Sequence, residues 1–353
     1  EVRRFEEAID TLTQATTIHK ELDDRHGEGQ ALNNLGLAQR EVRRFEEAID
    51  TLTQATTIHK ELDDRHGEGQ ALDNLGLALR EVQRFEEAIS THTQATTIFR
   101  AAGDRHREGI ALNNLGGVLQ RARRFEEAID AHTQATTIFH EAGNRHGEGT
   151  AMSNLGGALL QARRFEEAID TLTQATALHR NAGDDHGAGG ALNNLGLALL
   201  QVRRFEEAID TLTQATTISR ELDDHNEGQA LDNLGLALRE ARRFEEAINT
   251  LTQATALHRN AGDRQREGNA LGNLGLALQE VRRFEEAVNA FAQATTIFRE
   301  TGDRHSEGQA LYNLGNSLQE VWRFEEAIDA HTQATTIFRE IGDSHGNSQG
   351  RTA

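Results

Sequence analysis

Histidine has the most versatile side chain in this sequence, because it can transfer protons and bind metal ions near neutral pH. The 353-residue chain contains 16 histidines. One group lies in short polar segments that recur about every forty residues: His26, His66, His106, His146 and His305. A second group shares a position that holds phenylalanine elsewhere (Phe99, Phe139, Phe298 and Phe338) and consists of His59, His179 and His258.

A position that accepts either histidine or phenylalanine is typical of packing rather than of metal binding. No two histidines have the spacing of four residues that places two ligands on one face of a helix, as in helical zinc sites. We therefore expect the histidines to be loop and packing residues, with no metal site and no cofactor.

Paired carboxylates are the next candidates for chemistry. The sequence Phe-Glu-Glu-Ala recurs nine times, for example at Glu86 and Glu87. Acid–base catalysis needs two carboxylates in different environments, so identical copies predict a solvated acidic face instead. Gly67 and Gly69 follow no predicted strand and precede no lysine, unlike the glycines of a phosphate-binding loop. We find no nucleophile with a base near it and expect no enzyme.

Asparagine offers a binding chemistry. One asparagine recurs at the same place in each forty-residue unit: Asn34, Asn74, Asn114, Asn154, Asn194, Asn233, Asn273 and Asn313. An exposed carboxamide both donates and accepts hydrogen bonds, so it can pair with the backbone of an extended peptide whatever the peptide's side chains. We predict that these eight residues form a ligand-binding ladder. The alternative is that each asparagine bonds to the backbone of the next repeat and fixes the stack.

The neighbours of these asparagines vary between units. Gly117, Gly157 and Gly190 remove side chains beside the predicted ladder in the middle of the chain, where Ile110 is also found. Either these glycines widen the groove for a bulky ligand group, or they reflect neutral drift among near-identical copies.

The spacing of all these residues follows from internal repetition. Residues 1–40 and 41–80 differ at only two places, Asn33/Asp73 and Gln39/Leu79. In one unit, apolar residues at helical spacing predict a helix A from an Asp24 N-cap to about Glu41. A second apolar face predicts a helix B over 45–62. The residues predicted to be buried are Leu32, Leu35, Gly36 and Gln39 in helix A and Phe45, Ala48, Ile49, Leu52, Ala55 and His59 in helix B.

The whole chain contains nine such B helices and eight A helices. One unit, around 205–243, has 39 residues because the segment 223–226 is one residue short. A deletion that leaves both flanking helices in phase indicates a loop.

The pattern Leu72-x2-Leu75-Gly76-x2-Leu79, followed by Phe85-x2-Ala88 and Ala95, resembles the tetratricopeptide repeat family in its forty-residue, kinesin-light-chain-like type. Small residues let the two helices cross closely, while Phe85 and Leu75 would fill the hairpin core. HEAT repeats share the length but lack this pattern. The resemblance implies an all-α, right-handed superhelical solenoid of stacked antiparallel hairpins, with A helices lining the inner face.

Two departures from the family pattern concern the backbone. The chain has no proline, so the family's terminal proline is missing. Arg43, Gln83, Arg123 and Arg163 replace the usual glycine between helices A and B. We therefore expect that turn to lack its normal residue with positive φ.

Composition restricts the partners. The net charge of −20 argues against nucleic acid and against anionic membrane surfaces. With no cysteine, the chain has neither disulfides nor thiolate sites, which is compatible with a cytoplasmic location. We expect one solenoid over 1–341 and a polar C-terminal tail over 342–353. Because the chain opens on a B helix without its A partner, it reads as a piece of a longer array.

The predicted function is a protein–protein interaction scaffold that binds an extended peptide or protein segment in its concave groove. Near-identical, arginine-rich and lysine-poor copies resemble arrays in bacterial signalling proteins, which implies the sensor part of a larger protein of that kind. The alternative is a ligand-free structural spacer or a solenoid that associates end to end through its uncapped termini.

Overall fold

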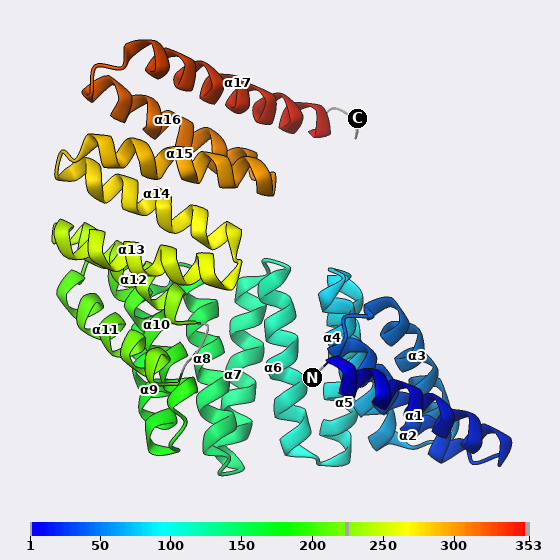
Figure 1. Ribbon diagram of the computed structural model, residues 1–353. Helices are drawn as coiled ribbons and strands as arrows, with labels where there is room; N and C mark the ends of the chain where they lie inside the picture. The colour runs from blue at the N-terminus through cyan, green and yellow to red at the C-terminus, as the bar shows by residue number, and fades with distance from the viewer. Residues whose placement is uncertain (1, 223–225, 350–353) are drawn as a thin grey trace. The chain divides into compact units, whose positions relative to one another are not determined.

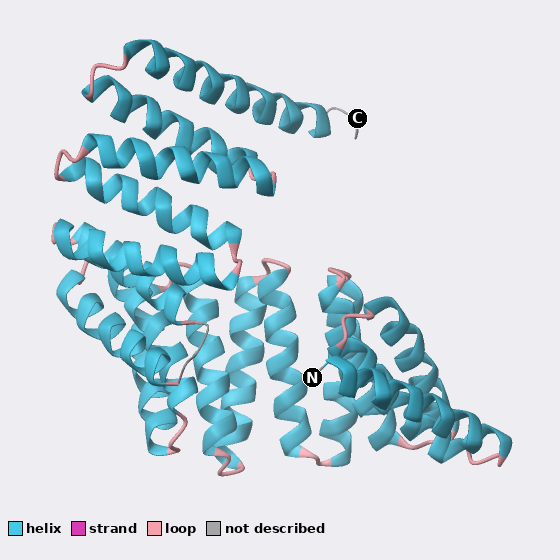
Figure 2. Cartoon of the chain, in the orientation of Figure 1, coloured by secondary structure: helices cyan, strands magenta, loops and turns pink. Residues whose placement is uncertain are grey.

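The structure is a computed structural model that describes the backbone of residues 2–222 and 226–349 and the side chains of 4–222 and 226–342. These residues form helices and turns without strands (Figure 2). The seventeen helices of the described ranges are α1 (Val2–Glu21), α2 (Arg25–Glu41), α3 (Phe45–Glu61), α4 (Arg65–Glu81), α5 (Phe85–Ala102), α6 (Arg105–Arg121), α7 (Phe125–Glu141), α8 (Arg145–Gln161), α9 (Phe165–Asn181), α10 (Asp185–Gln201), α11 (Phe205–Glu221), α12 (Glu227–Glu240), α13 (Phe244–Ala261), α14 (Arg264–Glu280), α15 (Phe284–Thr301), α16 (Arg304–Glu320) and α17 (Phe324–Gln349).

Odd-numbered helices are the predicted B helices and even-numbered ones the predicted A helices. The chain divides into two compact units, Glu1–Ala191 (unit 1) and Leu192–Ala353 (unit 2), with the division inside α10. From α1 to α9 and from α11 to α17, every helix packs on the next one along the chain (Figure 1). Successive A helices also touch, from α2 to α8 and from α12 to α16. The predicted all-α solenoid of stacked antiparallel hairpins is confirmed.

Every A helix except α12 starts at an Asp or Asn whose side chain caps it, as predicted for Asp24. In α2, Asp24 Oδ1 accepts a hydrogen bond from the Gly27 N–H at 2.9 Å, which satisfies one of the free donors at the helix start. The four side chains predicted to be buried in this helix, Leu32, Leu35, Gly36 and Gln39, are all buried.

Small residues of both helix types contribute to the core. Ala48, Leu52 and Ala55 of α3 are fully buried. The glycine in helix A allows close crossing, as predicted, because a Cβ on Gly76 would lie 2.5 Å from His92 Nε2 in α5. Burying a leucine side chain such as that of Leu52 contributes roughly 2 kcal/mol to stability through the hydrophobic effect.

The phenylalanine that opens each B helix is less central than predicted. Phe85 is half-buried and packs against the edge of the cluster that contains Leu52 and Leu75. Leu75 is buried, but Phe85 does not fill the hairpin core with it. Among the described residues, the fully buried phenylalanines are Phe99 and Phe291, which lie further along their B helices.

The turn between helices A and B corrects a second expectation. The residue that replaces glycine there keeps a positive φ of 61–65° in every described copy: Arg43, Gln83, Arg123, Arg163, Arg203, Arg242, Arg282 and Trp322. At the end of α2, the Arg43 N–H bonds to the Arg40 carbonyl and the Arg44 N–H to the Gln39 carbonyl, both at 2.9 Å. These two bonds form a Schellman motif, which satisfies the last carbonyls of the helix and offsets the backbone strain.

The shortened loop falls on 223–225, which lie outside the described residues. The helix after it, α12, has 14 residues where the other A helices have 17, and its N-cap Asn226 makes no side-chain capping bond. At the C-terminus, α17 continues to Gln349, so the backbone of the polar segment from residue 342 is helical that far. Among the described residues, no helix is both long enough and apolar enough to span a membrane.

Candidate ligand-binding groove

The eight predicted ladder residues all lie on A helices. Asn34 is exposed, and the other seven side chains are half-buried: Asn74, Asn114, Asn154, Asn194, Asn233, Asn273 and Asn313. Each follows directly after the residue that faces the adjacent B helix. Their half-buried state leaves each side chain partly accessible to a ligand.

Four of these asparagines bond to the preceding A helix. Asn74 Nδ2 donates to Asn33 Oδ1 at 3.0 Å, and Asn114 Nδ2 donates to Asp73 Oδ2 at 3.1 Å. The remaining bonds repeat this pattern, Asn154 to Asn113 at 3.1 Å and Asn233 to Asn193 at 2.8 Å. The acceptor is thus a side chain and not the backbone.

Each of these inter-repeat bonds uses one N–H of the amide. The second N–H and the carbonyl oxygen remain available, because a carboxamide has two donors and two lone pairs. The structural role and the ligand-binding role, which the sequence set against each other, are therefore compatible in one side chain.

In unit 2, a pocket of about 390 Å³ opens beside two of the predicted ladder residues. It is lined by residues of α14, α15 and α16: Asn269, Gly272, Asn273, Leu276, Phe291, Phe298, His305, Ser306, Gln309, Ala310 and Asn313. Its lining combines amide groups with apolar side chains. Such a lining suits a peptide, which carries both polar backbone and apolar side chains.

The amides of Asn273 and Asn313 make no hydrogen bond to another described residue. For Asn313, the acceptor position on the preceding A helix is Gly272, which has no side chain. For Asn273, that position is Asp232, whose Oδ2 lies 2.8 Å from His258 Nε2 instead. The pocket thus contains two half-buried amides with their full hydrogen-bonding capacity.

In two repeats the acceptor residue also bonds to a histidine of its own B helix. Asp73 pairs with His92, whose Nδ1 lies 2.7 Å from Asp73 Oδ1. Asn113 pairs with His132 in the same way at 2.9 Å. Gly272 and Phe291 both line the pocket, and a Cβ on Gly272 would meet no heavy atom within 4 Å. Asp73 and Asn113 thus bond both to the next repeat and to their own B helix.

Burial shifts two pKa values at these positions. It lowers the pKa of His132 to about 4, so the ring is neutral at pH 7. It raises the pKa of Asp232 to about 6, against the opposing effect of the His258 hydrogen bond. Neither group lines the pocket.

The glycines predicted to open the middle of the groove face free space. A Cβ on Gly117 or Gly190 would meet no heavy atom within 4 Å, and one on Gly157 would approach only the Gln120 side chain, at 3.7 Å. A larger residue would therefore fit at each place. Whether these glycines serve a ligand stays a prediction, and the pocket described above lies at Gly272 instead.

A second pocket in unit 2, of about 470 Å³, has a charged lining. Its cations are already paired, because Glu267 accepts hydrogen bonds from Arg259 and Arg264 at 2.7 Å each. The paired carboxylates of the repeated Phe-Glu-Glu-Ala are exposed, as predicted. Glu87 accepts from Arg84 at 2.6 Å, and Glu86 accepts from Arg124 of the next repeat at 3.2 Å.

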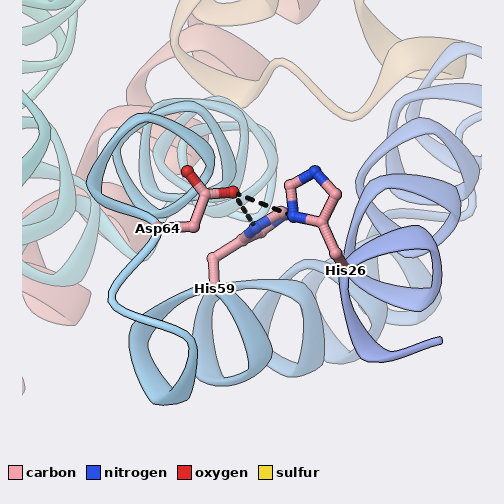
Figure 3. Close-up of side chains that lie close together, drawn as sticks. All are labelled: His26, His59 and Asp64. Carbon is pink, nitrogen blue, oxygen red and sulfur yellow. Dashed lines mark hydrogen bonds and ion pairs between the residues drawn. The ribbon is translucent and has the colours of Figure 1, made fainter. Parts of the chain in front are cut away.

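The structure also assembles a side-chain cluster that the sequence did not predict. His26, His59 and Asp64 converge at the contact between two repeats, and both histidine rings point to one carboxylate oxygen (Figure 3). The same arrangement occurs at His146, His179 and Asp184. Spacings of 33 and 5 residues could have revealed both clusters, but a search for histidines four residues apart on one helix misses them.

Sequence comparisons identify the repeats. The profile of a family described as tetratricopeptide repeat matches residues 1–61, 107–181, 187–260 and 266–340. A second profile with the same description matches residues 71–106. A search among curated proteins found no match.

Solved structures with the same fold share little sequence with this chain. The apo form of the quorum sensor NprR from B. thuringiensis has a TM-score of 0.63 at 12% identity, covering 95% of this chain and 99% of its own. The apo form of RapI has a TM-score of 0.62 at 12% identity, over 78% and 99%. A Rap protein in complex with competence and sporulation factor has a TM-score of 0.57 at 13% identity, over 97% and 99%.

These neighbours agree with the helix-hairpin architecture, and the family profiles cover most of the chain, including the helices that carry the asparagines. Both profiles describe a repeat, and neither description names an enzymatic family. The chain belongs to the tetratricopeptide repeat family.

Proposed function

We propose that the protein is an interaction scaffold whose A-helix asparagines bind the backbone of an extended peptide or protein segment. The observation that carries this proposal is the pocket of about 390 Å³ between α14 and α16. There Asn273 and Asn313 offer unpaired amides beside the apolar Leu276 and Phe298. An extended strand presents both backbone groups and alternating side chains, so it matches such a lining.

The remaining ladder residues would extend the same contact along each unit. In this scheme Asn34, Asn74, Asn114 and Asn154 contribute from unit 1, and Asn194 and Asn233 contribute from unit 2. The variable residues beside them, such as Ile110 and Gln309, would select among side chains of the ligand. The scheme requires neither a metal nor a cofactor.

The structural neighbours support a role in recognition. One is a quorum sensor, and another was solved in complex with a factor. By analogy, we propose that this chain is the sensor part of a larger bacterial signalling protein and acts in the cytoplasm. Nucleic acid and membranes are not part of this proposal, because the charge of −20 opposes binding to both.

The test is a selection of random peptides against the wild-type chain, followed by affinity measurements on a selected peptide. The double variant Asn273→Ala/Asn313→Ala should bind at least tenfold more weakly and melt within about 2 °C of the wild type, because its amides have no internal partner. Asn289→Ala is the matched control, since this asparagine is exposed on α15. Equal affinities for all three proteins would reject the pocket as the binding site.

A second candidate function is self-association, which a surface feature of α17 favours. Ile328 is 65% exposed, whereas its counterpart Ile49 in α3 is only 6% exposed. A helix from a second copy could cover this face. Sedimentation at increasing concentration should then show dimers that Ile328→Glu removes. A monomer at every concentration would leave the ligand-free spacer as the remaining alternative to a peptide-binding scaffold.

A further inference from the structure

The histidine–aspartate clusters of unit 1 combine three ligating side chains from neighbouring repeats. In each, one ring nitrogen of each histidine and one carboxylate oxygen all lie within 4.8 Å of one another. His26 comes from the start of α2, His59 from the end of α3, and Asp64 from the cap of α4. His146, His179 and Asp184 repeat this arrangement three repeats later.

The distances are close to those between ligands of a small metal ion. His59 Nδ1 lies 2.8 Å and His26 Nδ1 lies 3.5 Å from Asp64 Oδ2. The corresponding distances to Asp184 Oδ2 are 2.7 Å from His179 and 3.3 Å from His146. Ligands about 2.0–2.1 Å from a tetrahedral zinc ion are roughly 3.3 Å apart. Small side-chain rotations would therefore admit an ion. His26 is exposed, and its far nitrogen Nε2 lies 2.8 Å from Gln30 Nε2.

Other contacts orient the ligands in advance. Asp64 Oδ1 accepts a hydrogen bond from the Gly67 N–H at 2.9 Å, which leaves Oδ2 directed at the two rings. Asp184 is held by the Gly187 N–H in the same way at 2.8 Å. In the second cluster, His179 Nε2 lies 3.1 Å from Ser153 Oγ. Such a partner on the far ring nitrogen is typical of metal-binding histidines.

Space beside the buried histidine is provided by glycine. A Cβ on Gly67 would collide with His59 Nδ1, and a Cβ on Gly187 would collide with His179 Nδ1. Where His258 occupies the same helix position, Arg266 replaces that glycine, and the ring turns its Nε2 to Asp232 instead. Both clusters therefore have this glycine, whereas the repeat of His258 lacks both the glycine and the convergent geometry.

We propose that each cluster binds one divalent first-row transition metal ion, such as Zn²⁺, through two imidazole nitrogens and one carboxylate oxygen. Water would complete the coordination on the side of the exposed His26 or His146. Imidazole ligands suit zinc and its neighbours, whereas Mg²⁺ and Ca²⁺ prefer oxygen ligands alone. An ion in the first cluster would join α2, α3 and α4, and so connect two consecutive repeats.

The repeats themselves supply the matched control. In the adjacent repeat, Phe99 takes the place of the buried histidine, while His66 and Asp104 keep theirs. His66 stacks edge-on against Phe99 with ring centroids 6.1 Å apart, the same separation as between His26 and His59. Phenylalanine therefore fits this position in a folded repeat of the same chain.

The first experiment is a calorimetric Zn²⁺ titration of the full chain and of His59→Phe/His179→Phe. The variant should bind two fewer equivalents than the wild type and keep its helical circular dichroism. With Co²⁺ as a spectroscopic probe, the wild type should show the d–d absorption of the bound ion and the variant should not. Zn²⁺, but not Mg²⁺, should raise the melting temperature of the wild type, and neither ion should raise that of the variant. Equal stoichiometry in the two proteins, or no Zn²⁺ binding by the wild type, would overturn the proposal.

The second experiment adds a cluster. Phe99→His supplies the missing nitrogen beside His66 and Asp104, and Arg107→Gly removes a cation whose Nε lies 3.6 Å from Asp104 Oδ2. The double variant should bind one more equivalent of Zn²⁺ than the wild type, while Arg107→Gly alone should bind the same number. If the folded double variant bound no additional equivalent, the two histidines, the aspartate and the glycine would not be sufficient for a metal site, which contradicts the proposal.

Discussion

At the residue scale, the acceptor position of the A helix shows how near-identical repeats differ without losing their packing. Asp73 accompanies His92, Asn113 accompanies His132, and Gly272 accompanies Phe291. Asp73 and Asn113 each bond to the ring of that histidine, whereas Asn33 and Asn193 occupy the acceptor position in repeats whose B helix carries leucine instead. Buried polar groups need partners of this kind, because an unmade hydrogen bond costs about 1–3 kcal/mol.

His132 predicts a pH dependence of stability. Burial lowers its pKa from 6.5 to about 4 in the folded protein. As the pH falls from about 6.5 to 4, the unfolded chain binds a proton that the folded protein does not, so stability decreases, by up to about 3 kcal/mol. His132→Leu should remove this loss, because Leu172 fills the same position in another repeat.

The measurement is urea unfolding at pH 7.5 and pH 4.5 for the wild type and His132→Leu. The difference between the two pH values should be smaller in the variant. An identical difference in both proteins would mean that the buried ring is not the source of the pH dependence.

The same scale shows what the sequence could and could not predict. The positions of the eight asparagines follow from helical periodicity, and the structure places all of them on A helices. Their hydrogen-bond partners could not be predicted from periodicity, because the acceptor of Asn114 is Asp73, about one repeat away and on a separate helix. The contact of His26 with Asp64 escaped prediction for the same reason.

At the element scale, the turn between helices A and B has backbone strain, because residues other than glycine occupy its position of positive φ. Arg123 and Arg163 have φ values of 61° and 63°, where glycine would be unstrained. Arg123→Gly and Arg163→Gly should each stabilise the protein by about 1 kcal/mol, since a side chain in the left-handed region costs roughly that much. The gain would be measured by denaturant unfolding.

The loop between repeats provides the reverse experiment. Gly143 has a φ of 68°, and a Cβ there would meet nothing within 4 Å. Gly143→Ala should therefore destabilise the protein by about 1 kcal/mol through backbone strain alone. If Gly143→Ala and both arginine replacements left the free energy of unfolding unchanged, the left-handed conformation would not be retained in solution.

Burial along the B helix predicts unequal costs of truncation. Leu172 is fully buried, whereas Phe165, which opens the same helix, is half-buried. Leu172→Ala should cost about 3–5 kcal/mol, and Phe165→Ala roughly 2 kcal/mol. If thermal unfolding ranked the two variants in the opposite order, the assignment of the hairpin core would be wrong.

This difference also explains one limit of sequence reasoning about the elements. Periodicity correctly predicted the helices and their buried faces. It could not distinguish a phenylalanine that opens a helix, such as the half-buried Phe85, from the buried Phe99 near the other end of the same helix. The positive φ at Arg43 escaped for another reason, because two backbone hydrogen bonds outweigh a residue preference that favours glycine.

At the scale of the whole molecule, each helix in unit 1 contacts only its near neighbours along the chain. Stability in such a stack is a sum of local terms and nearest-neighbour terms. Leu52→Ala in α3 should therefore increase amide hydrogen exchange most within α2, α3 and α4, as measured by mass spectrometry. An equal increase in α8 would contradict this local coupling.

The same repetition gives the asparagines their regular spacing, so the scaffold and its proposed ligand contacts arise from one sequence unit. Asn114 donates to the neighbouring repeat, whereas Asn273 keeps both donors and its acceptor free beside the pocket. Although the two residues are chemically identical, replacing Asn114 and replacing Asn273 are thus expected to have different effects on stability and on ligand affinity.

The most direct test measures unfolding free energy and affinity for a selected peptide together, for Asn114→Ala and Asn273→Ala. We predict that Asn114→Ala loses about 1 kcal/mol of stability, whereas Asn273→Ala keeps its stability and loses at least threefold in affinity. Unchanged affinity in Asn273→Ala would contradict the claim that free asparagine amides on the A helices bind the ligand.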